Sequence, residues 1–267
     1  MHIKAKKSLG QHFLKDNNVI RKMVNIEDLK DKNVLEIGPG KGILTRALLE
    51  SGSNVIAVEL DERVIDLLRS EFCSYDDRIS IIHGDILNID INSLFQGEKY
   101  VVVSNIPYYI TGLILSLFLD SKHKPESMTL LVQKEVAERV VARDGKESIL
   151  SMAVKAYGNP ELSFLVKRGC FEPVPNVDSA VLHIRNIRSI EENPKNISKI
   201  PQESFLKCIK TGFSHKRKIL YANLCNIYTR ETVEKVWNEL ELNRNIRAED
   251  VNIDIWFKIA SALHKNS

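Results

Sequence analysis

The sequence predicts an α/β fold, in which a parallel sheet carries helices on both faces and a small helical domain follows. Short apolar runs with strand character alternate with helical patterns over the first half of the chain, which is typical of a parallel sheet. The C-terminal part holds helical patterns alone. The strands of the sheet are expected at residues 33–38, 54–59, 79–82, 100–104 and 128–133.

Helical spacing of apolar residues accompanies these strands. The second helix has a clear start signal, because the Asp61 side chain can cap its first free backbone N–H groups. Two further strands are expected, with a proline-rich stretch at residues 171–175 between them. The helices are expected at residues 43–50, 61–70 and 134–143, and the later strands at residues 161–167 and 180–185.

Two domains are predicted. Residues 1–187 hold the sheet and a basic N-terminal segment, and residues 203–267 form the helical domain. Residues 188–202 are polar and contain two prolines, so they are the candidate linker. The helices of the second domain are expected at residues 203–211, 216–224, 231–240 and 253–262.

Composition excludes several classes of protein. The chain has 267 residues, of which 43% are hydrophobic, and no apolar run approaches the roughly 20 residues of a membrane span. It begins without the apolar core of a signal peptide, so a cytoplasmic protein without a membrane partner is expected. The four cysteines lie far apart and the histidines show no ligand spacing, so reduced thiols and no metal are expected.

Positive charge is concentrated in two places, although the net charge is only +3. Residues 1–25 hold six basic residues against one acid, and residues 207–230 hold six basic residues and no acid. The second cluster includes Lys216, Arg217 and Lys218. Such clusters are typical of proteins that bind a phosphate backbone. A solvated basic face is the alternative interpretation of each.

Polar signals follow the first three strands. Glu36 to Gly42 contains a G-x-G-x-G turn, in which Gly38 and its neighbours allow a ligand close to the backbone. Glu59 ends the second strand and can accept from ribose hydroxyls, as it would in an NAD enzyme. Asp85 follows the third strand and can accept from an adenine amino group, or can simply cap a helix. With the motif after the fourth strand, this order suggests S-adenosylmethionine.

That motif is the run Asn105-Ile106-Pro107-Tyr108. The Asn105 side chain offers an oxygen that accepts from an amino group. Pro107 has no N–H, so the turn presents carbonyls with few competing donors. Tyr108 offers a flat face on which a base can stack. The motif indicates amine methylation of a flipped base, with a strand-to-loop turn carrying a half-buried aromatic as the alternative.

Several stretches together resemble the KsgA-type small-subunit rRNA adenine dimethyltransferases, and the similarity covers nearly the whole chain. The resemblance implies a Rossmann-like S-adenosylmethionine-dependent methyltransferase domain. It also implies a substrate, two neighbouring adenosines near the 3′ end of small-subunit rRNA in a pre-30S particle. The stretches are 7–14, 36–40, 105–108, 131–139, 173–181 and 213–218.

The family motifs also imply roles for single residues. His12 and Leu14 line the cofactor pocket, Gly38 holds the methionine end, Glu59 the ribose and Asp85 the adenine of the cofactor. Asn105 lies where cofactor and target meet, Tyr108 stacks on the target base, and Phe171 is the candidate for its other face.

The expected mechanism needs no metal and no strong base. The Asn105 side-chain oxygen and the Ile106 carbonyl accept hydrogen bonds from the adenine amine, which directs its lone pair at the sulfonium methyl. Positioning then supplies much of the acceleration. Pro107 and Tyr108 complete the catalytic group, because stacking on Tyr108 offsets part of the cost of flipping the base.

One segment departs from the family pattern, and three rival functions stay open. Residues 144–151 stand where the family often carries Tyr-Gly-Arg-Leu-Ser. The nearest rival is the Erm-type enzyme that methylates large-subunit rRNA and confers antibiotic resistance. The others are a non-catalytic ribosome-assembly factor on the same scaffold and an NAD oxidoreductase, which the glycine spacing disfavours. We expect the chain to act as a monomer.

Overall fold

The computed structural model describes residue 6 and residues 10–265, and it divides into two compact units. Unit 1 comprises residues 1–137 and 161–187, and unit 2 comprises residues 138–160 and 188–267. The division after residue 187 coincides with the predicted end of the first domain. Residues 138–160 differ from the prediction, because they cluster with the C-terminal helices and not with the sheet.

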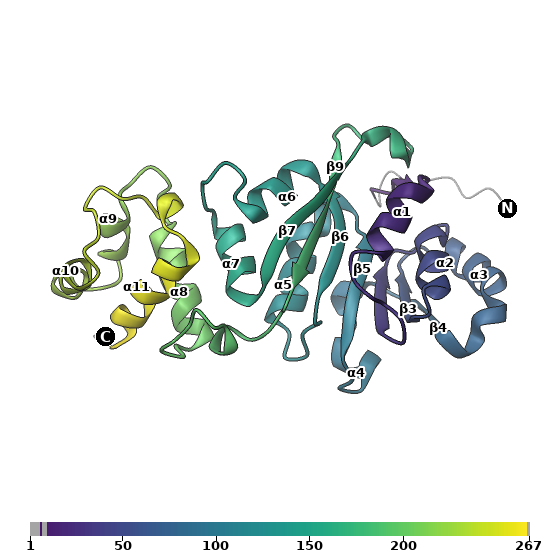
Figure 1. Ribbon diagram of the computed structural model, residues 1–267, viewed down its shortest axis with the longest axis horizontal. Helices are drawn as coiled ribbons and strands as arrows, with labels where there is room; N and C mark the ends of the chain where they lie inside the picture. Colours follow the sequence, from purple (N-terminus) through teal and green to yellow (C-terminus); the bar gives the residue numbers. More distant parts are fainter. Residues whose placement is uncertain (1–5, 7–9, 266–267) are drawn as a thin grey trace. The chain divides into compact units, whose positions relative to one another are not determined.

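Unit 1 is built on a seven-stranded sheet with the order β4-β3-β2-β5-β6-β9-β7 (Figure 1). The first five strands in this order pair in parallel, as predicted. Strand β9 runs antiparallel to β6. The strands are β2 (Asn33–Ile37), β3 (Asn54–Glu59), β4 (Ile79–His83), β5 (Tyr100–Asn105), β6 (Met128–Gln133), β7 (Asn159–Val166) and β9 (Ser179–Arg185).

Helices cover this sheet, with α2 and α3 on one side of β5 and α5 on the other (Figure 1). The predictions for α2 and α3 are confirmed, and Asp61 caps α3 by accepting from the Arg63 N–H. Helices α1, α4 and α5 were not predicted. The helices are α1 (Asn17–Val24), α2 (Ile43–Glu50), α3 (Glu62–Glu71), α4 (Ile91–Phe95), α5 (Thr111–Asp120) and α6 (Lys134–Val141), which crosses the boundary between the units.

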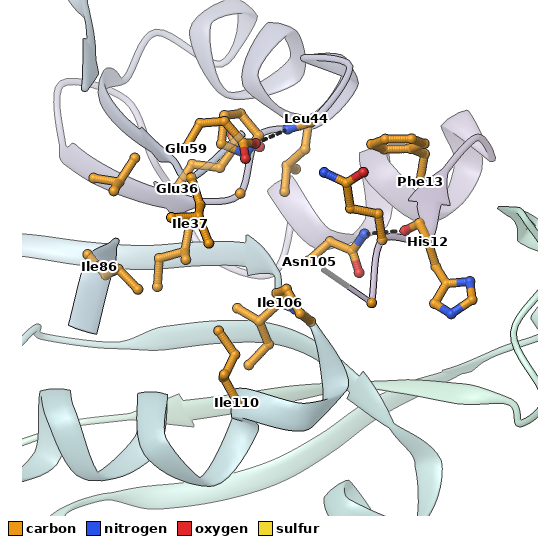
Figure 2. Close-up of a pocket in the computed structure, with 18 of the residues that line it drawn as sticks. His12, Phe13, Glu36, Ile37, Leu44, Glu59, Ile86, Asn105, Ile106 and Ile110 are labelled. Atoms are coloured by element: carbon orange, nitrogen blue, oxygen red, sulfur yellow. Dashed lines mark hydrogen bonds between the residues drawn. The ribbon is translucent and has the colours of Figure 1, made fainter. Parts of the chain in front are cut away.

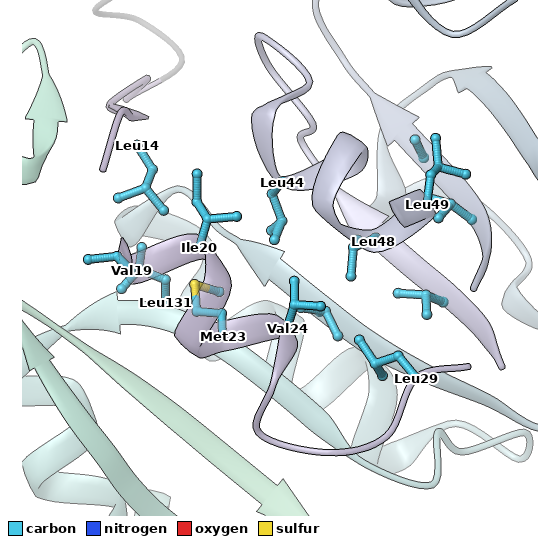
Figure 3. Close-up of a cluster of buried hydrophobic side chains, with 14 of the residues drawn as sticks. Leu14, Val19, Ile20, Met23, Val24, Leu29, Leu44, Leu48, Leu49 and Leu131 are labelled. Carbon is cyan, nitrogen blue, oxygen red and sulfur yellow. The ribbon is translucent and has the colours of Figure 1, made fainter. Parts of the chain in front are cut away.

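The N-terminal segment is fixed to unit 1 by a small sheet and by helix α1. Strand β1 (Phe13–Leu14) pairs antiparallel with β8 (Phe171–Glu172). Asp16 caps α1, which buries Ile20 and Met23 among leucines of α2 (Figure 3). Burying each of these side chains stabilises the folded protein by about 1.5–3 kcal/mol. This packing holds β1 beside the strand ends where the polar motifs lie.

Unit 2 is helical. The predicted helices at 203–211, 231–240 and 253–262 are confirmed as α8 (Gln202–Gly212), α10 (Arg230–Glu239) and α11 (Ile253–Lys265). The helix predicted at 216–224 was wrong in its first half, because α9 spans only Leu220–Leu224. The Asn223 amide donates to the carbonyls of Gly212 and His215, at 2.6 and 3.1 Å, and so stabilises a turn in place of helix.

Helix α7 (Ile149–Tyr157) explains two polar segments of unit 2. Residues 144–151, the departure from the family pattern, provide its cap: Ser148 and Ser151 form a capping box, and Glu147 pairs with Lys155 at 2.7 Å. In the candidate linker, Asn193 is buried and its amide donates to the Ala156 carbonyl at 2.7 Å. These polar residues therefore have structural partners at both ends of one helix.

None of the helices among the described residues has the length and apolar character needed to cross a membrane. No cluster of three or more His, Cys, Asp or Glu side chains among these residues could hold a metal ion.

Candidate functional site

A pocket lies at the carboxyl ends of β2, β3, β4 and β5, where the N-terminal segment covers them (Figure 2). Parallel sheets of this kind bind ligands at this edge. Nine of the predicted site residues line it. They are His12, Leu14, Gly38, Glu59, Asp85, Asn105, Ile106, Pro107 and Tyr108.

Two glycines of the turn have different surroundings. One leaves open space in the pocket, and the other lies close to a side chain of the N-terminal segment. Gly38 has φ +65°, and a Cβ added there would meet nothing within 4 Å, so a ligand can approach its backbone. Gly40 has φ +54°, and a Cβ there would lie 2.9 Å from the Phe13 ring. The turn therefore needs glycine for a ligand at one position and for contact with strand β1 at the other.

Glu59 is 4% exposed and is held by the backbone on two sides. Its Oε2 accepts from the Gly40 N–H at 3.1 Å, and its Oε1 accepts from the Asp61 N–H at 2.8 Å. Burial raises the pKa of this carboxyl, and the two backbone hydrogen bonds oppose that rise. Each carboxylate oxygen has a second lone pair, so Glu59 can still accept from the hydroxyls of a ligand.

Asp85 caps a short helical turn and also lines the pocket. It accepts from the Leu87 N–H at 3.0 Å and from the Asn88 amide at 3.2 Å. Ile86, next to it, is buried and offers an apolar surface to the pocket (Figure 2). The two interpretations of Asp85 are thus compatible, because the cap fixes a half-buried carboxylate at the pocket wall.

Glu36 lines the same pocket and was not predicted as a site residue. It is 1% exposed and accepts from the Thr45 hydroxyl at 2.6 Å. Burial raises its pKa to about 8, so the carboxyl is mostly protonated at neutral pH. The sequence signal that could have identified Glu36 is its position as a charged residue inside an otherwise apolar strand.

Asn105 is oriented by the N-terminal segment. Its Nδ2 donates to the His12 carbonyl at 3.1 Å, and its Oδ1 is directed away from that carbonyl (Figure 2). The amide oxygen is the group that can accept from an amine. The next residue, Ile106, buries its side chain in unit 1 and leaves the backbone turn at the pocket.

Tyr108 is half-buried and is held at both ends. Its Oη lies 2.7 Å from the Ser179 hydroxyl, and its ring stacks on that of His12, with centroids 5.8 Å apart and planes 21° apart. Burial raises the pKa of the phenol, so it stays neutral. Ser179 was not predicted as part of the site, because it comes from β9, far away in the sequence.

The N-terminal segment connects the two sides of the pocket. The Gln11 amide donates to Asp61 at 3.3 Å, and His12 Nδ1 lies 2.8 Å from the Pro173 carbonyl. The Arg63 guanidinium holds the pKa of Asp61 well below its usual range, so this partner of Gln11 is charged. Residues 7–9 of the motif at 7–14 lie outside the described residues.

Two groups of predicted residues are not brought to the pocket. Phe171 lies in the hydrophobic core of unit 1 and is fully buried, so it presents no face to a base in this structure. Lys216, Arg217 and Lys218 are exposed on the turn of unit 2 that precedes α9.

The fold with its strand-end pocket is shared with solved methyltransferases, and the sequence places the chain in one family of them. The sequence model described as "Ribosomal RNA adenine dimethylase" matches residues 2–265, and the chain belongs to this family. It is therefore an enzyme of the rRNA adenine dimethyltransferase class.

Individual relatives agree with this assignment. The chain is 37% identical over 264 residues to "Ribosomal RNA small subunit methyltransferase A" of Fusobacterium nucleatum, and the alignment covers 97% of each chain. It is 36% identical to the protein of the same name from Ligilactobacillus salivarius, over 97% of this chain and 90% of that one.

Solved structures show the same fold. The 23S rRNA methyltransferase ErmE is similar with a TM-score of 0.77 and 27% identity, over 94% of this chain and 99% of that one. A dimethyladenosine transferase from Plasmodium falciparum is similar with a TM-score of 0.78 and 24% identity, over 93% of this chain and 96% of that one.

Proposed function

We propose that this protein dimethylates the N6 amines of two adjacent adenosines in the 3′-terminal hairpin of small-subunit rRNA, with S-adenosylmethionine as methyl donor. The observation that carries the proposal is the joint position of Asn105 and Tyr108. An amide oxygen that can accept from an amine and a half-buried ring that can stack on a base line the same pocket. The names of the two sequence relatives described above, both small-subunit methyltransferases, support the choice of RNA.

The pocket fits the proposed donor. Gly38 leaves room for the methionine end, Glu59 keeps lone pairs for the ribose hydroxyls, and Asp85 beside Ile86 suits an adenine. His12 and Leu14 line the pocket from the N-terminal segment. When bound, S-adenosylmethionine supplies an electrophilic methyl group on its sulfonium.

The chain's own residues then position the target amine. Asn105 Oδ1 and the Ile106 carbonyl accept its two N–H groups, which favours a pyramidal nitrogen with its lone pair directed at the methyl group. Tyr108 stacks on the flipped base and stabilises it by roughly 1–3 kcal/mol. Because the methylated ammonium is acidic, its proton can pass to water, so neither a metal nor a strong base is required.

The proposal extends to the partner. The protein acts as a monomer on a pre-30S particle, in the cytoplasm where such particles assemble. The exposed cluster Lys216, Arg217 and Lys218 binds the phosphate backbone. All three residues are available for such contacts, since they lie exposed on a turn.

Transfer of radiolabelled methyl groups to unmethylated small subunits tests the proposal, with primer extension to map the modified bases. Stops at two adjacent adenosines near the 3′ end are expected. Absence of transfer to small subunits would overturn it.

The Erm-type function is the second candidate, and the similarity to ErmE favours it. The same assay on protein-free large-subunit RNA separates the two, because label would then appear there and not in small subunits. If no methyl group is transferred to either RNA, the result would favour a non-catalytic assembly factor.

A further inference from the structure

We propose that His12 is a positioning residue for the target base, and that its side chain acts on the RNA step by supporting Tyr108. The inference rests on the proposed function. It adds to the place that the family motif gives this residue in the cofactor pocket, because His12 also contacts the two groups that would receive the target, Tyr108 and Asn105.

Two contacts define this role. The His12 ring stacks on Tyr108 with its plane turned by 21°. The His12 carbonyl accepts from Asn105 Nδ2 at 3.1 Å. Thus the residue just before strand β1 touches both the stacking platform and the amide that accepts the amine.

The His12 ring is itself fixed. Its Nδ1 lies 2.8 Å from the Pro173 carbonyl, and because a carbonyl oxygen can only accept, Nδ1 carries the proton. Strand β1 is held in turn by its pairing with β8, which ends at the residue before Pro173. The ring therefore cannot rotate away from Tyr108 without losing this hydrogen bond.

Two contacts hold Tyr108. Ser179 contacts its hydroxyl, at 2.7 Å, and the His12 ring stacks on its own ring. Leu14, the other N-terminal residue predicted to line the cofactor pocket, is buried in the core of unit 1. His12 is thus the one of these two N-terminal residues whose side chain supports the target platform.

The experiment compares His12→Ala, His12→Phe and the full-length wild type, with His264→Ala as control. His264 is an exposed histidine on α11 that contacts Ser204. For each protein we would measure kcat and KM with small-subunit RNA, and the Kd of S-adenosylhomocysteine by calorimetry. A 2-aminopurine placed at the target position reports stacking through its fluorescence.

We expect His12→Ala to lower kcat/KM for RNA by about 10- to 100-fold, because small displacements at a reacting centre carry large losses. The Kd of S-adenosylhomocysteine should stay within about twofold, as expected for groups that act on one step only. His12→Phe keeps a ring on Tyr108 and should recover part of the loss. In a double-mutant cycle with Tyr108→Ala, the two losses should not add.

Unchanged RNA kinetics in His12→Ala would overturn the inference. So would additive losses in the cycle, or a weakening of S-adenosylhomocysteine binding by the same factor as the loss of kcat/KM. A wild type that transfers no methyl group to small-subunit RNA would instead overturn the proposed function, and the two failures are therefore distinguishable.

Discussion

In the proposed function, the pocket has a cofactor side, formed by Gly38, Glu59 and Asp85, and a target side, formed by His12, Asn105 and Tyr108. On the cofactor side each residue lies at the carboxyl end of its own strand of the parallel sheet, and backbone N–H groups of the same region hold Glu59 and Asp85. On the target side the residues come from the segment before β1, from β5 and from the turn after β5, and Tyr108 also contacts Ser179 of β9. From this comparison we expect the first side to bind the cofactor and the second side to position the reacting amine.

The largest effect is expected on the target side. Asn105→Ala should lower kcat by about 10²–10³-fold, as does loss of one positioned hydrogen-bonding group in other active sites. Binding of S-adenosylhomocysteine should be nearly unchanged, since Asn105 receives the amine. Asn33→Ala is the matched control, because Asn33 lies at the opposite end of the sheet and contacts Glu98. A variant with near-normal turnover would remove Asn105 from the mechanism.

A smaller effect is expected on the cofactor side, where the Kd of S-adenosylhomocysteine should change and not kcat. Glu59→Gln places an NH₂ group against one of the two backbone N–H groups that Glu59 now accepts. We expect about 10- to 100-fold weaker binding of S-adenosylhomocysteine by calorimetry, as for loss of a hydrogen bond to a charged group. Glu239→Gln, on the exposed surface of α10, is the control. Equal affinities in Glu59→Gln and the wild type would show that Glu59 does not contact the ligand.

A third effect is expected on RNA binding, through the basic turn of unit 2 that is proposed to contact the RNA backbone. Replacing Lys216, Arg217 and Lys218 with alanine should weaken RNA binding and flatten its dependence on salt by about 0.7–0.9 per lost phosphate contact. A triple variant of Lys30, Lys122 and Lys258 removes the same charge from scattered exposed positions. If RNA binding by both variants depends on salt concentration as it does in the wild type, the side chains of the cluster contact only solvent.

The last effect is on stability and not on activity, and it concerns Glu36, whose pKa is raised to about 8 by burial. The Glu36 carboxyl has a higher pKa in the folded protein than its unfolded value near 4.5. Its protonated form therefore stabilises the folded state fully below pH 4.5. This contribution to the free energy of unfolding is lost as pH rises through 8. The wild type should therefore lose up to about 1.4 kcal/mol per pH unit between these values. Glu36→Gln, which can still accept from Thr45, should remove this part of the slope in urea unfolding at several pH values. Identical slopes would mean that Glu36 is ionised in the folded protein.

The two sides also differ in how far the sequence predicts them. Gly38, Glu59 and Asp85 could be placed together from strand order alone, because parallel strands bring their carboxyl ends to one edge. The Asn105–Tyr108 turn could be predicted for the same reason. The contacts of His12 with Pro173 and of Tyr108 with Ser179 could not, since they join residues 161 and 71 positions apart. Phe171 shows the same limit, because only the packing of β8 places it in the core.

Outside the pocket, local signals decided which elements could be predicted. Clear strand runs gave accurate bounds for β3 and β6, helical spacing gave those of α2, and capping by Asp61 marked the start of α3. Helix α5 lacks such signals, because its sequence is apolar on nearly all sides and follows the aromatic turn directly. The start of α9 depends on a tertiary contact, the Asn223 amide, and so could not be read from helical spacing.

Single-turnover methyl transfer to unmethylated small subunits, measured over rising concentrations of S-adenosylmethionine, tests the division of the pocket most directly. Glu59→Gln should reach a rate near that of the wild type once the methyl donor is saturating, because only binding is weakened. Asn105→Ala should stay slow at every concentration, because positioning of the amine is lost. If saturation restores both variants, or neither, the two sides of the pocket do not divide binding from transfer.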